Sequence, residues 1–370
     1  MTLILLVAGL CLLVLGGELL VRGASKTAAR AGVSPLVIGL TVVAFGTSAP
    51  EMVVSVMSSA AGRSDIALGN VVGSNIFNVL FILGLCSAIV PLVVSQRIVR
   101  IEVPIMIGLS VLVYGMGGDG RIGRVEGVLL LAGLLAYTLV QIRQSRKEKD
   151  ERVKAEYEAE IGATAGKAGG RWSVNIGLIA AGLVLLVVGS RWFVTGAVAV
   201  ARQMGVDDLV IGLTVVAAGT SLPELATSVV AGIRGERDIA VGNVVGSNIF
   251  NLLGVLGLAA VVGSRGLEVS RAVLSFDFPV MTAVAIACLP IFFTGHRIAR
   301  WEGVLFLFYY AAYTLYLVLA ASQHDALPLY NAAMMWFVVP LTVLTLAVVA
   351  VRSSLERRRP GTGEEGRRVG

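Results

Sequence analysis

Two short polar motifs interrupt apolar stretches of the chain, and each ends in a glutamate. They are GTSAPE at Gly46–Glu51 and GTSLPE at Gly219–Glu224. The proline of each motif has no N–H, so it breaks the helix and leaves a backbone carbonyl without its helical partner. In each copy a threonine, the glutamate and a later serine are spaced by four, which places their oxygens on one helix face. These sets are Thr47, Glu51 and Ser55, and Thr220, Glu224 and Ser228.

A second polar motif, GNVVGSNIFN, follows each of the first, at Gly69–Asn78 and Gly242–Asn251. We expect four interrupted helices to bring its amides and hydroxyls together with the two carboxylates. Neither His nor Cys occurs in these motifs, and oxygen ligands suit Ca²⁺, Mg²⁺ or Na⁺ rather than soft metals. Spacing alone leaves open whether its polar residues bind ions or pack helices. They are Asn70, Ser74 and Asn78, and Asn243, Ser247 and Asn251.

Both motifs belong to a 46-residue segment that occurs twice. Gly39–Gly84 returns without a gap as Gly212–Gly257, 173 residues later, with 30 of 46 positions identical. Weaker similarity at the same offset extends upstream, from Gly9–Gly17 to Gly182–Ser190. An acid inside a membrane is a functional candidate by default. One that recurs in the same context is poorly explained by packing alone, so we interpret the segments as two halves of one ion site.

The composition is typical of an integral membrane protein. Of 370 residues, 56% are apolar and 15% are charged, and the mean hydropathy is +0.86. The net charge of +6 comes from basic residues in short loops and a tail, which indicates membrane orientation rather than nucleic-acid binding. Cys11, Cys86 and Cys288 lie in apolar runs, which predicts buried thiols rather than disulfides or a metal cluster.

The elements that position the motifs are apolar runs long enough to cross a bilayer, which takes about 20 residues. We expect an all-α polytopic membrane protein with two inverted five-helix repeats and one extra C-terminal helix. The expected organisation is a first repeat at 1–143, a polar cytoplasmic linker at 144–171, a second repeat at 172–322, and the extra helix with a charged tail at 323–370. The eleven predicted spans are about 3–22, 35–59, 66–92, 99–117, 124–142, 173–200, 208–232, 238–262, 272–295, 301–321 and 331–351.

The distribution of basic residues predicts the orientation of these spans. With the N-terminus outside and the C-terminus inside, 23 Lys and Arg residues lie on the cytoplasmic side and 7 on the other. The two copies of the repeat begin five spans apart, an odd number, so they cross the membrane in opposite directions. Inverted repeats with interrupted helices are typical of alternating-access transporters that bind ions near the midplane.

The paired motifs resemble the α-1 and α-2 repeats of the Ca²⁺/cation antiporter superfamily, and the prokaryotic sodium/calcium exchanger branch in particular. Members have a ten-helix core in two inverted halves, so an eleventh helix departs from the pattern. The resemblance implies Ca²⁺ ligation by the carboxylates of Glu51 and Glu224 and the carbonyls of Thr47 and Thr220. It implies Na⁺ ligation by the hydroxyls of Ser48, Ser221, Ser74 and Ser247 and the carbonyls of Ala44 and Ala217. Asn78 and Asn251 then line the centre.

The residue at position 251 leaves the counter-ion open. Sodium/calcium exchangers typically carry an Asp there, whereas this chain has Asn251, and proton/calcium exchangers commonly lack that Asp. We expect a secondary antiporter that extrudes Ca²⁺ across a cell membrane against inward Na⁺. The alternative within the class is H⁺/Ca²⁺ exchange, and the alternative from another class is a cation channel. The inverted repeat argues against a channel, whose filter is usually repeated around an axis.

The expected partners follow from this function. Ca²⁺ and Na⁺, or H⁺, are substrates, the surroundings are a lipid bilayer, and the chain is expected to work as a monomer. No cofactor, enzyme activity or nucleic-acid partner is expected. Glu18 lies within the first predicted span, and its repeat counterpart is Arg191. An ion pair or a charge that reaches toward the interface explains Glu18 better than ion ligation.

Overall fold

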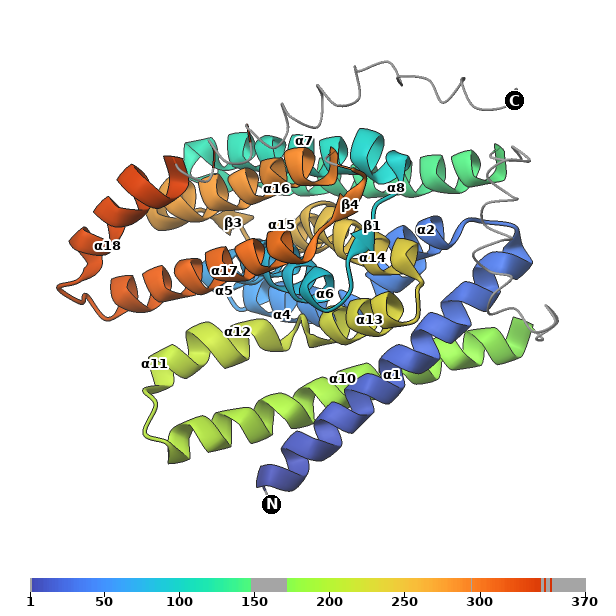
Figure 1. Cartoon of the computed structure of the whole chain (residues 1–370). Helices are drawn as coiled ribbons and strands as arrows, with labels where there is room; N and C mark the ends of the chain where they lie inside the picture. Colours follow the sequence, from blue (N-terminus) through green and yellow to red (C-terminus); the bar gives the residue numbers. More distant parts are fainter. Residues whose placement is uncertain (1, 148–171, 294, 341–342, 344–346, 348–370) are drawn as a thin grey trace, which may run out of the picture.

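The computed structural model describes residues 2–147, 172–293, 295–340, 343 and 347, and these residues form helices joined by short turns and strands (Figure 1). The predicted linker and the charged tail lie almost entirely outside the described residues. The first half contains α1 (Thr2–Ala31), α2 (Pro35–Ile38), η1 (Gly39–Val43), α3 (Ala44–Thr47), α4 (Ala49–Ala60), α5 (Ser64–Phe77), η2 (Asn78–Leu83), α6 (Gly84–Ile89), β1 (Leu92–Val93), η3 (Ile98–Glu102), α7 (Val103–Met116), η4 (Gly117–Asp119), β2 (Arg121–Ile122) and α8 (Arg124–Lys147).

The second half repeats this order, except that its described residues have no element in the place of η4 and end with α18 and η8; η marks π- and 3₁₀-helical turns in both halves. It contains α10 (Trp172–Gln203), α11 (Asp208–Ile211), η5 (Gly212–Val216), α12 (Ala217–Gly219), α13 (Leu222–Ile233), α14 (Arg237–Phe250), η6 (Asn251–Val255), α15 (Leu256–Val262), β3 (Leu267–Glu268), η7 (Val273–Asp277), α16 (Phe278–Phe293), β4 (Arg297–Ile298), α17 (Arg300–Ala321), α18 (Leu327–Ala333) and η8 (Met334–Val338).

The chain is a multi-pass membrane protein. The described residues contain eight helices that are long and apolar enough to cross a bilayer, or nine if the bent pair Pro35–Thr47 and Ala49–Ala60 is one span. The seventh predicted span is divided, and its apolar helix Leu222–Ile233 is shorter than a bilayer crossing. The eleventh lies partly outside the described residues. The count of eleven and the orientation therefore stay predictions.

The interruptions occur in two of the four predicted places. At the first motif, the two parts of the bent pair meet at 46°, with Pro50 in the first turn of α4. Its repeat counterpart separates α12 from α13 at Thr220–Ser221. The expectation of a break at GNVVGSNIFN was wrong, because Ser64–Ile89 and Arg237–Val262 are continuous. Each instead contains a π-helical turn, a local widening that is frequent at functional sites.

The two continuous helices form the centre of the protein. They are 72% and 89% buried over their most apolar stretch, more than any other span in the described part of the chain. The remaining helices surround them, with α7, α8 and α16 on one side in Figure 1. Cys86 and Cys288 are buried as predicted, whereas Cys11 is exposed because it lies on the outer face of α1. All three thiols are free.

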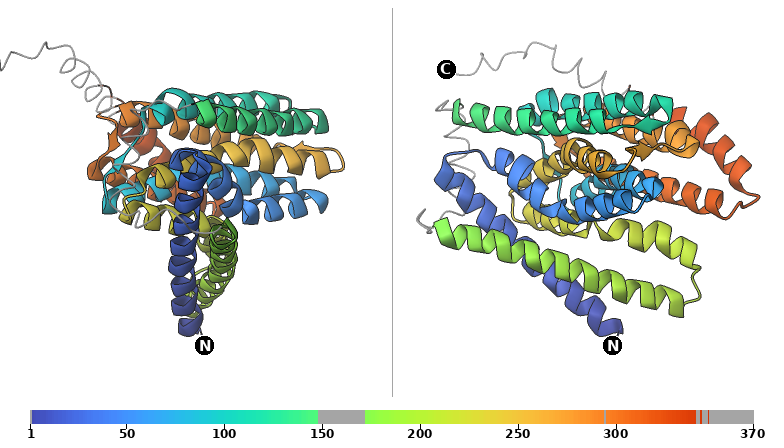
Figure 2. Two further views of the ribbon diagram at one scale, coloured as in Figure 1. Left: turned by 90° about the vertical axis from the view of Figure 1, so that its right-hand side faces the viewer. Right: turned by 180° about the vertical axis from the view of Figure 1, so that it is seen from behind.

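Helices α1 and α10 cross each other in a separate layer at one edge of the bundle (Figures 1 and 2). Glycines spaced by seven residues line the crossing: Gly9, Gly16 and Gly23 on α1, and Gly182, Gly189 and Gly196 on α10. A Cβ at any of the six would come within 3.0 Å of the partner helix. Small residues at such a stripe let two helix backbones approach closely, so this pair is packed as one unit.

Two short antiparallel ribbons join the halves. Leu92 pairs with Ile298 in the ribbon of β1 and β4, and Ile122 pairs with Leu267 in the ribbon of β2 and β3. Each ribbon takes one strand from each half. The two ribbons mark opposite ends of the bundle, which we call the β1–β4 end and the β2–β3 end.

Candidate functional site

The two glutamates lie at the start of the helices that follow the GTSxPE breaks. Ser48 lies between α3 and α4, Ser221 directly precedes α13, and Pro50 and Pro223 are the second residues of α4 and α13. Proline suits the first helical turn because its missing N–H has no helical partner there. Glu51 and Glu224 follow directly, and neither side chain has any exposed surface. The sequence therefore places a carboxylate at each helix start, inside the protein.

Each carboxylate is held by a serine from the opposite half. The Ser48 hydroxyl donates to Glu224 Oε1 at 2.9 Å, and the Ser221 hydroxyl donates to Glu51 Oε1 at 2.7 Å. The two bonds are repeat equivalents, meaning that their residues lie 173 positions apart. The structure thus brings both predicted acids and both serines into one reciprocal arrangement between α4 and α13.

Asn70 and Asn243 brace this arrangement. The Asn70 amide donates to the Glu51 carbonyl at 3.0 Å and to Ser55 Oγ at 2.8 Å, and its oxygen accepts from Thr220 at 3.3 Å. The Asn243 amide donates to the Glu224 carbonyl at 3.3 Å and to Ser228 Oγ at 2.9 Å, and its oxygen accepts from Thr47 at 3.2 Å. All these amide groups have protein partners, so packing explains both residues.

Three pairs of repeat equivalents carry buried oxygens that have no hydrogen-bond partner. They are Glu51 Oε2 and Glu224 Oε2, Ser74 Oγ and Ser247 Oγ, and Asn78 Oδ1 and Asn251 Oδ1. All six side chains are at most 3% exposed. Buried polar atoms are normally hydrogen-bonded, and an unpaired group costs free energy. A set of such oxygens with two carboxylates has the chemistry of a hard-cation site.

The surrounding helices place these groups toward one another. The π-turn η2, which begins at Asn78, packs against α13 and α14, and η6, which begins at Asn251, packs against α4 and α5. The π-turn that begins at each asparagine therefore packs on the helix that carries the other half's glutamate. The described residues contain no group of three His, Cys, Asp or Glu side chains that could hold a metal. Any cation bound here is bound largely by neutral oxygens.

The helices that cover this centre are packed differently at its two ends. We call α2, η1 and α3 beside α14 the β1–β4 flank, and α11, η5 and α12 beside α5 the β2–β3 flank. A Cβ at Gly246 would lie 2.7 Å from Leu40 Cα, because η1 packs tightly on α14 at the β1–β4 end. Its repeat equivalent Gly73 has no atom within 4 Å of the same position, and the same holds for Gly69 and Gly212. The segment of α11, η5 and α12 therefore packs on α5 mainly through α12 and the Thr220 that follows it, more loosely than α2, η1 and α3 pack on α14.

The same asymmetry appears in the predicted carbonyl ligands. Ala44 is 1% exposed and Thr47 has no exposed surface. By contrast, Ala217 is exposed and Thr220 is half-buried. The first-half residues are therefore covered, whereas their second-half equivalents have exposed surface.

Glu18 forms an ion pair, as the sequence predicts, but its partners are not on α10. Its carboxylate contacts Arg22 at 2.6 Å and forms an ion pair with Arg234, in the turn between α13 and α14. Ser25 on α1 donates to Glu236 in the same turn at 2.8 Å. These bonds tie the α1–α10 layer to the β1–β4 end.

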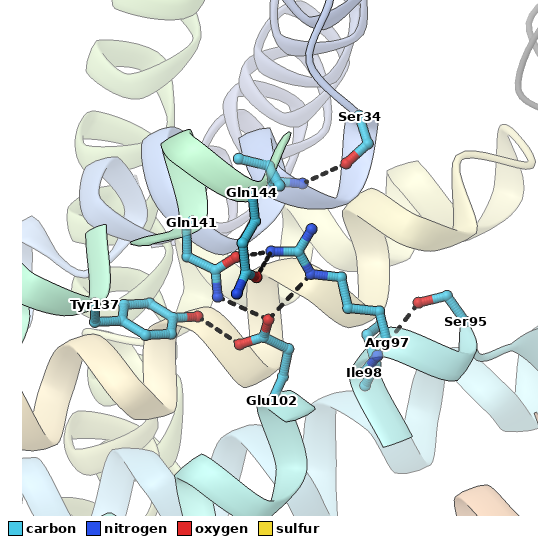
Figure 3. Close-up of polar contacts among 9 residues, drawn as sticks. Ser34, Ser95, Arg97, Ile98, Glu102, Tyr137, Gln141 and Gln144 are labelled. Atoms are coloured by element: carbon cyan, nitrogen blue, oxygen red, sulfur yellow. Dashed lines mark hydrogen bonds and ion pairs between the residues drawn. The ribbon is translucent and has the colours of Figure 1, made fainter. Parts of the chain in front are cut away.

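Sequence reasoning missed two groups of polar residues. The first is a buried cluster around Glu102, which accepts from Tyr137 at 2.8 Å and Gln141 at 2.7 Å, with Arg97 Nε at 3.4 Å (Figure 3). Asp277 accepts similarly from Tyr313 at 3.2 Å in the second half. The signal was an acid two residues before Pro104 and Pro279. This cluster braces helices rather than lining the centre.

The second missed group is Asn75 and Asn248, which are repeat equivalents next to the centre. The Asn248 oxygen accepts from the Asn78 amide at 3.0 Å, and the Asn248 amide donates to the Asn75 carbonyl at 3.3 Å. The Asn75 amide donates to the Val71 carbonyl at 2.8 Å. Both side chains are at most 3% exposed. They stand three residues before Asn78 and Asn251, which is the signal that could have found them.

Comparisons with known proteins agree with this architecture. The profile of the family described as "Sodium/calcium exchanger protein" matches residues 1–143 and 174–319. The inner membrane protein YrbG of Escherichia coli is 38% identical over 285 residues, which are 76% of this chain and 86% of that protein. The sodium/calcium exchanger MaX1 of Methanosarcina acetivorans is 32% identical over 343 residues, 85% of this chain and 97% of that protein.

A solved structure has the same fold. It is the sodium-calcium exchanger NCX_Mj soaked with Na⁺ and Ca²⁺, with a TM-score of 0.70 and 30% sequence identity. The match covers 87% of this chain and 98% of that chain.

Proposed function

Because the chain belongs to the sodium/calcium exchanger protein family, we propose that it is a secondary antiporter that exchanges Ca²⁺ for Na⁺ by alternating access. Its family consists of ion transporters rather than enzymes. The proposed substrates are Ca²⁺ and Na⁺, and the proposed location is a cell membrane, in line with the name of the E. coli relative.

One observation carries this proposal: three repeat-equivalent pairs of buried oxygens without a partner lie on the helices where the two halves meet. Two carboxylates can neutralise one divalent cation, and the Glu51 and Glu224 oxygens are the proposed Ca²⁺ ligands with the carbonyls of Thr47 and Thr220. The hydroxyls of Ser74 and Ser247 are neutral oxygens suited to Na⁺. Ser48, Ser221 and the carbonyls of Ala44 and Ala217 complete the proposed Na⁺ ligands.

The enclosure of the carboxylates favours an antiporter over a channel. Neither glutamate has exposed surface, whereas conduction needs a continuous filter through which ions can leave as readily as they enter. In alternating access, one flank of an enclosed site opens at a time. We propose that this structure has the β1–β4 flank closed and the β2–β3 flank loosened, and that the β2–β3 end faces outward.

Proton exchange is the second candidate, and Asn251 is the observation that favours it. An asparagine at this position removes one acidic charge from the centre, and two carboxylates can carry either one Ca²⁺ or two protons. Na⁺ remains our first choice because the centre still offers several neutral oxygens without partners.

The test is calcium uptake into proteoliposomes that contain the purified chain. An outwardly directed Na⁺ gradient and an outwardly directed proton gradient are imposed separately. Uptake driven by Na⁺ alone supports the proposal, and uptake driven only by the pH gradient supports the proton alternative. Calcium flux that persists without any exchangeable cation identifies a channel and contradicts both.

A further inference from the structure

The asparagine next to each central asparagine has no assigned role, and its bonds differ between the halves. Asn78 is held by Asn248, whereas the repeat-equivalent bond between Asn251 and Asn75 is not formed. Asn75 Oδ1 and both amide atoms of Asn251 have no partner.

Backbone carbonyls fix which way these amides face. Asn248 points toward the carbonyl oxygen of Asn75, which can only accept, so the NH₂ group of Asn248 must lie there. Asn248 Oδ1 then faces Asn78, and Asn78 must present its own NH₂ to it. Asn78 Oδ1 is left without a partner and is available to a cation.

The same logic applies to the unformed pair. The NH₂ group of Asn75 donates to the Val71 carbonyl, so Asn75 Oδ1 faces away from it. An Asn251 NH₂ that donated to Asn75 Oδ1 would leave Asn251 Oδ1 for a cation. Both atoms of this missing bond are buried and unpartnered.

The bond that is formed involves the asparagine of α14, the helix that η1 covers closely. Asn248 follows Gly246 by two residues on α14, where η1 packs tightly. Asn75 follows Gly73 by two residues on α5, where nothing lies within 4 Å of the glycine. The closely covered helix α14 thus supplies Asn248, which holds Asn78, whereas Asn75 on the less covered helix α5 does not hold Asn251.

We propose that Asn248 and Asn75 are positioning residues that aim the amide oxygens of Asn78 and Asn251 at the transported cation, and that the two hydrogen bonds alternate with the closed flank. The inference rests on the proposed function. Asn248 orients Asn78 while the β1–β4 flank is closed, and Asn75 orients Asn251 while the β2–β3 flank is closed. An unheld amide can turn its NH₂ toward the ion, which repels a cation.

The test replaces each residue by leucine, which has a similar shape and no polar atom. In sided proteoliposomes, Asn248→Leu should raise the KM for Ca²⁺ about tenfold at the β2–β3 face, and the matched variant Asn75→Leu should do so at the opposite face. Asn248→Ser, which is too short to reach Asn78, should behave like Asn248→Leu. In an Asn78→Ala background, Asn248→Leu should have no added effect, because it acts through Asn78. A purely structural role predicts additive losses and equal effects at both faces.

The Ca²⁺-induced rise in Tm of the purified chain separates this inference from the proposed function. Wild-type protein should be stabilised by Ca²⁺, and Asn248→Leu should be stabilised less. If wild type binds Ca²⁺ without transporting it, the function fails while the Tm comparison still tests the asparagines. If every variant has the KM for Ca²⁺ and the Ca²⁺-induced rise in Tm of the wild type, the inference is overturned and the proposed function is not. Absence of Ca²⁺ and Na⁺ binding in wild type overturns both.

Discussion

Gly16 and Gly182 lie in direct backbone contact where α1 crosses α10. A Cβ at Gly16 would stand 2.9 Å from the Gly182 carbonyl oxygen, and one at Gly182 would stand 2.8 Å from the Gly16 carbonyl oxygen. The three nearest atoms at Gly182 all belong to the backbone, and those at Gly16 are two backbone atoms and Leu186 Cγ, so a Cβ cannot be accommodated by moving the end of a flexible side chain.

The first prediction concerns this crossing. Gly16→Ala and Gly182→Ala should each destabilise the protein by about 1–3 kcal/mol, because overpacking forces the two helices apart. Gly177→Ala is the matched control, since Gly177 lies on α10 like Gly182 and a Cβ added there would have no atom within 4 Å. Thermal unfolding in detergent measures all three. Equal Tm values for Gly16→Ala and Gly177→Ala would show that α1 and α10 are not tightly packed.

The second prediction concerns the two carboxylates. Glu51→Gln and Glu224→Gln should each abolish Ca²⁺ transport while the protein remains folded, because one carboxylate cannot neutralise a desolvated divalent ion. An uncompensated buried charge costs at least several kcal/mol. Glu268→Gln, on the exposed strand position of β3, should transport normally. Near-normal uptake by either site variant would exclude its glutamate as an essential ligand.

The third prediction concerns the ion pair of Glu18 with Arg234. The repeat equivalents of these residues are Arg191 and Ala61, so no such pair can form at the β2–β3 end. Glu18→Gln should therefore loosen only the β1–β4 flank.

A cysteine reporter measures this loosening. Leu40→Cys, in η1 and 2% exposed as leucine, in a chain lacking the three native cysteines, should react faster with a small thiol reagent when Glu18→Gln is present. Val216→Cys, on the exposed opposite segment, should react at the same rate with or without it. An unchanged rate at Leu40→Cys counts against the ion pair as a restraint on this flank.

The fourth prediction concerns orientation. Lys26→Cys, at the β1–β4 end, should resist an impermeant thiol reagent in intact cells, and Arg265→Cys, at the β2–β3 end, should be labelled. Cysteines in the 144–171 linker and after Arg352 should also resist it, by the 23 to 7 bias of basic residues. The reverse labelling pattern would invert the proposed topology. Labelling of the tail alone would mean that the eleventh helix does not span.

The fifth prediction concerns the counter-ion. A site with two carboxylates can hold three Na⁺ with one unit of excess charge, so exchange of three Na⁺ for one Ca²⁺ moves one net charge per cycle. A membrane potential then biases transport by about 2.3 kcal/mol per 100 mV. Na⁺-driven Ca²⁺ flux should therefore change with a potential set by K⁺ and valinomycin. Flux that ignores both Na⁺ and potential but follows the pH gradient would establish proton exchange.

Much of the centre could be predicted from single residues and their spacing. Pro50 and Pro223 dictate a helix start, so the break at GTSxPE and the position of each glutamate follow from the chain alone. The opposite directions of the two copies stay a prediction from counting spans. The break expected at GNVVGSNIFN failed because glycines in a packed helix let another helix approach, as Gly242 and Gly246 do, without ending the helix.

The other features depend on contacts between the halves. Spacing left open whether Asn70 binds an ion or packs helices, and the structure shows that its amide donates to the Glu51 carbonyl and to Ser55. The role of Asn248 depends on the carbonyl of Asn75, which no local pattern reveals. The different packing of the two flanks is the feature that the sequence is least able to predict. Two segments that are identical at 30 of 46 positions cannot indicate by themselves which one is packed closely and which one loosely.

The two strand ribbons have a consequence for how the protein is made. During synthesis the first half is complete before β3 and β4 are translated. The strands that contain Leu92 and Ile122 can therefore pair only after the second half has been made. The two halves are thus joined by strand pairing at both ends of the bundle and do not fold as two independent units. If the chain is divided within 148–171 and the two polypeptides are co-expressed, they should still associate. Neither polypeptide should accumulate in cells that make it alone.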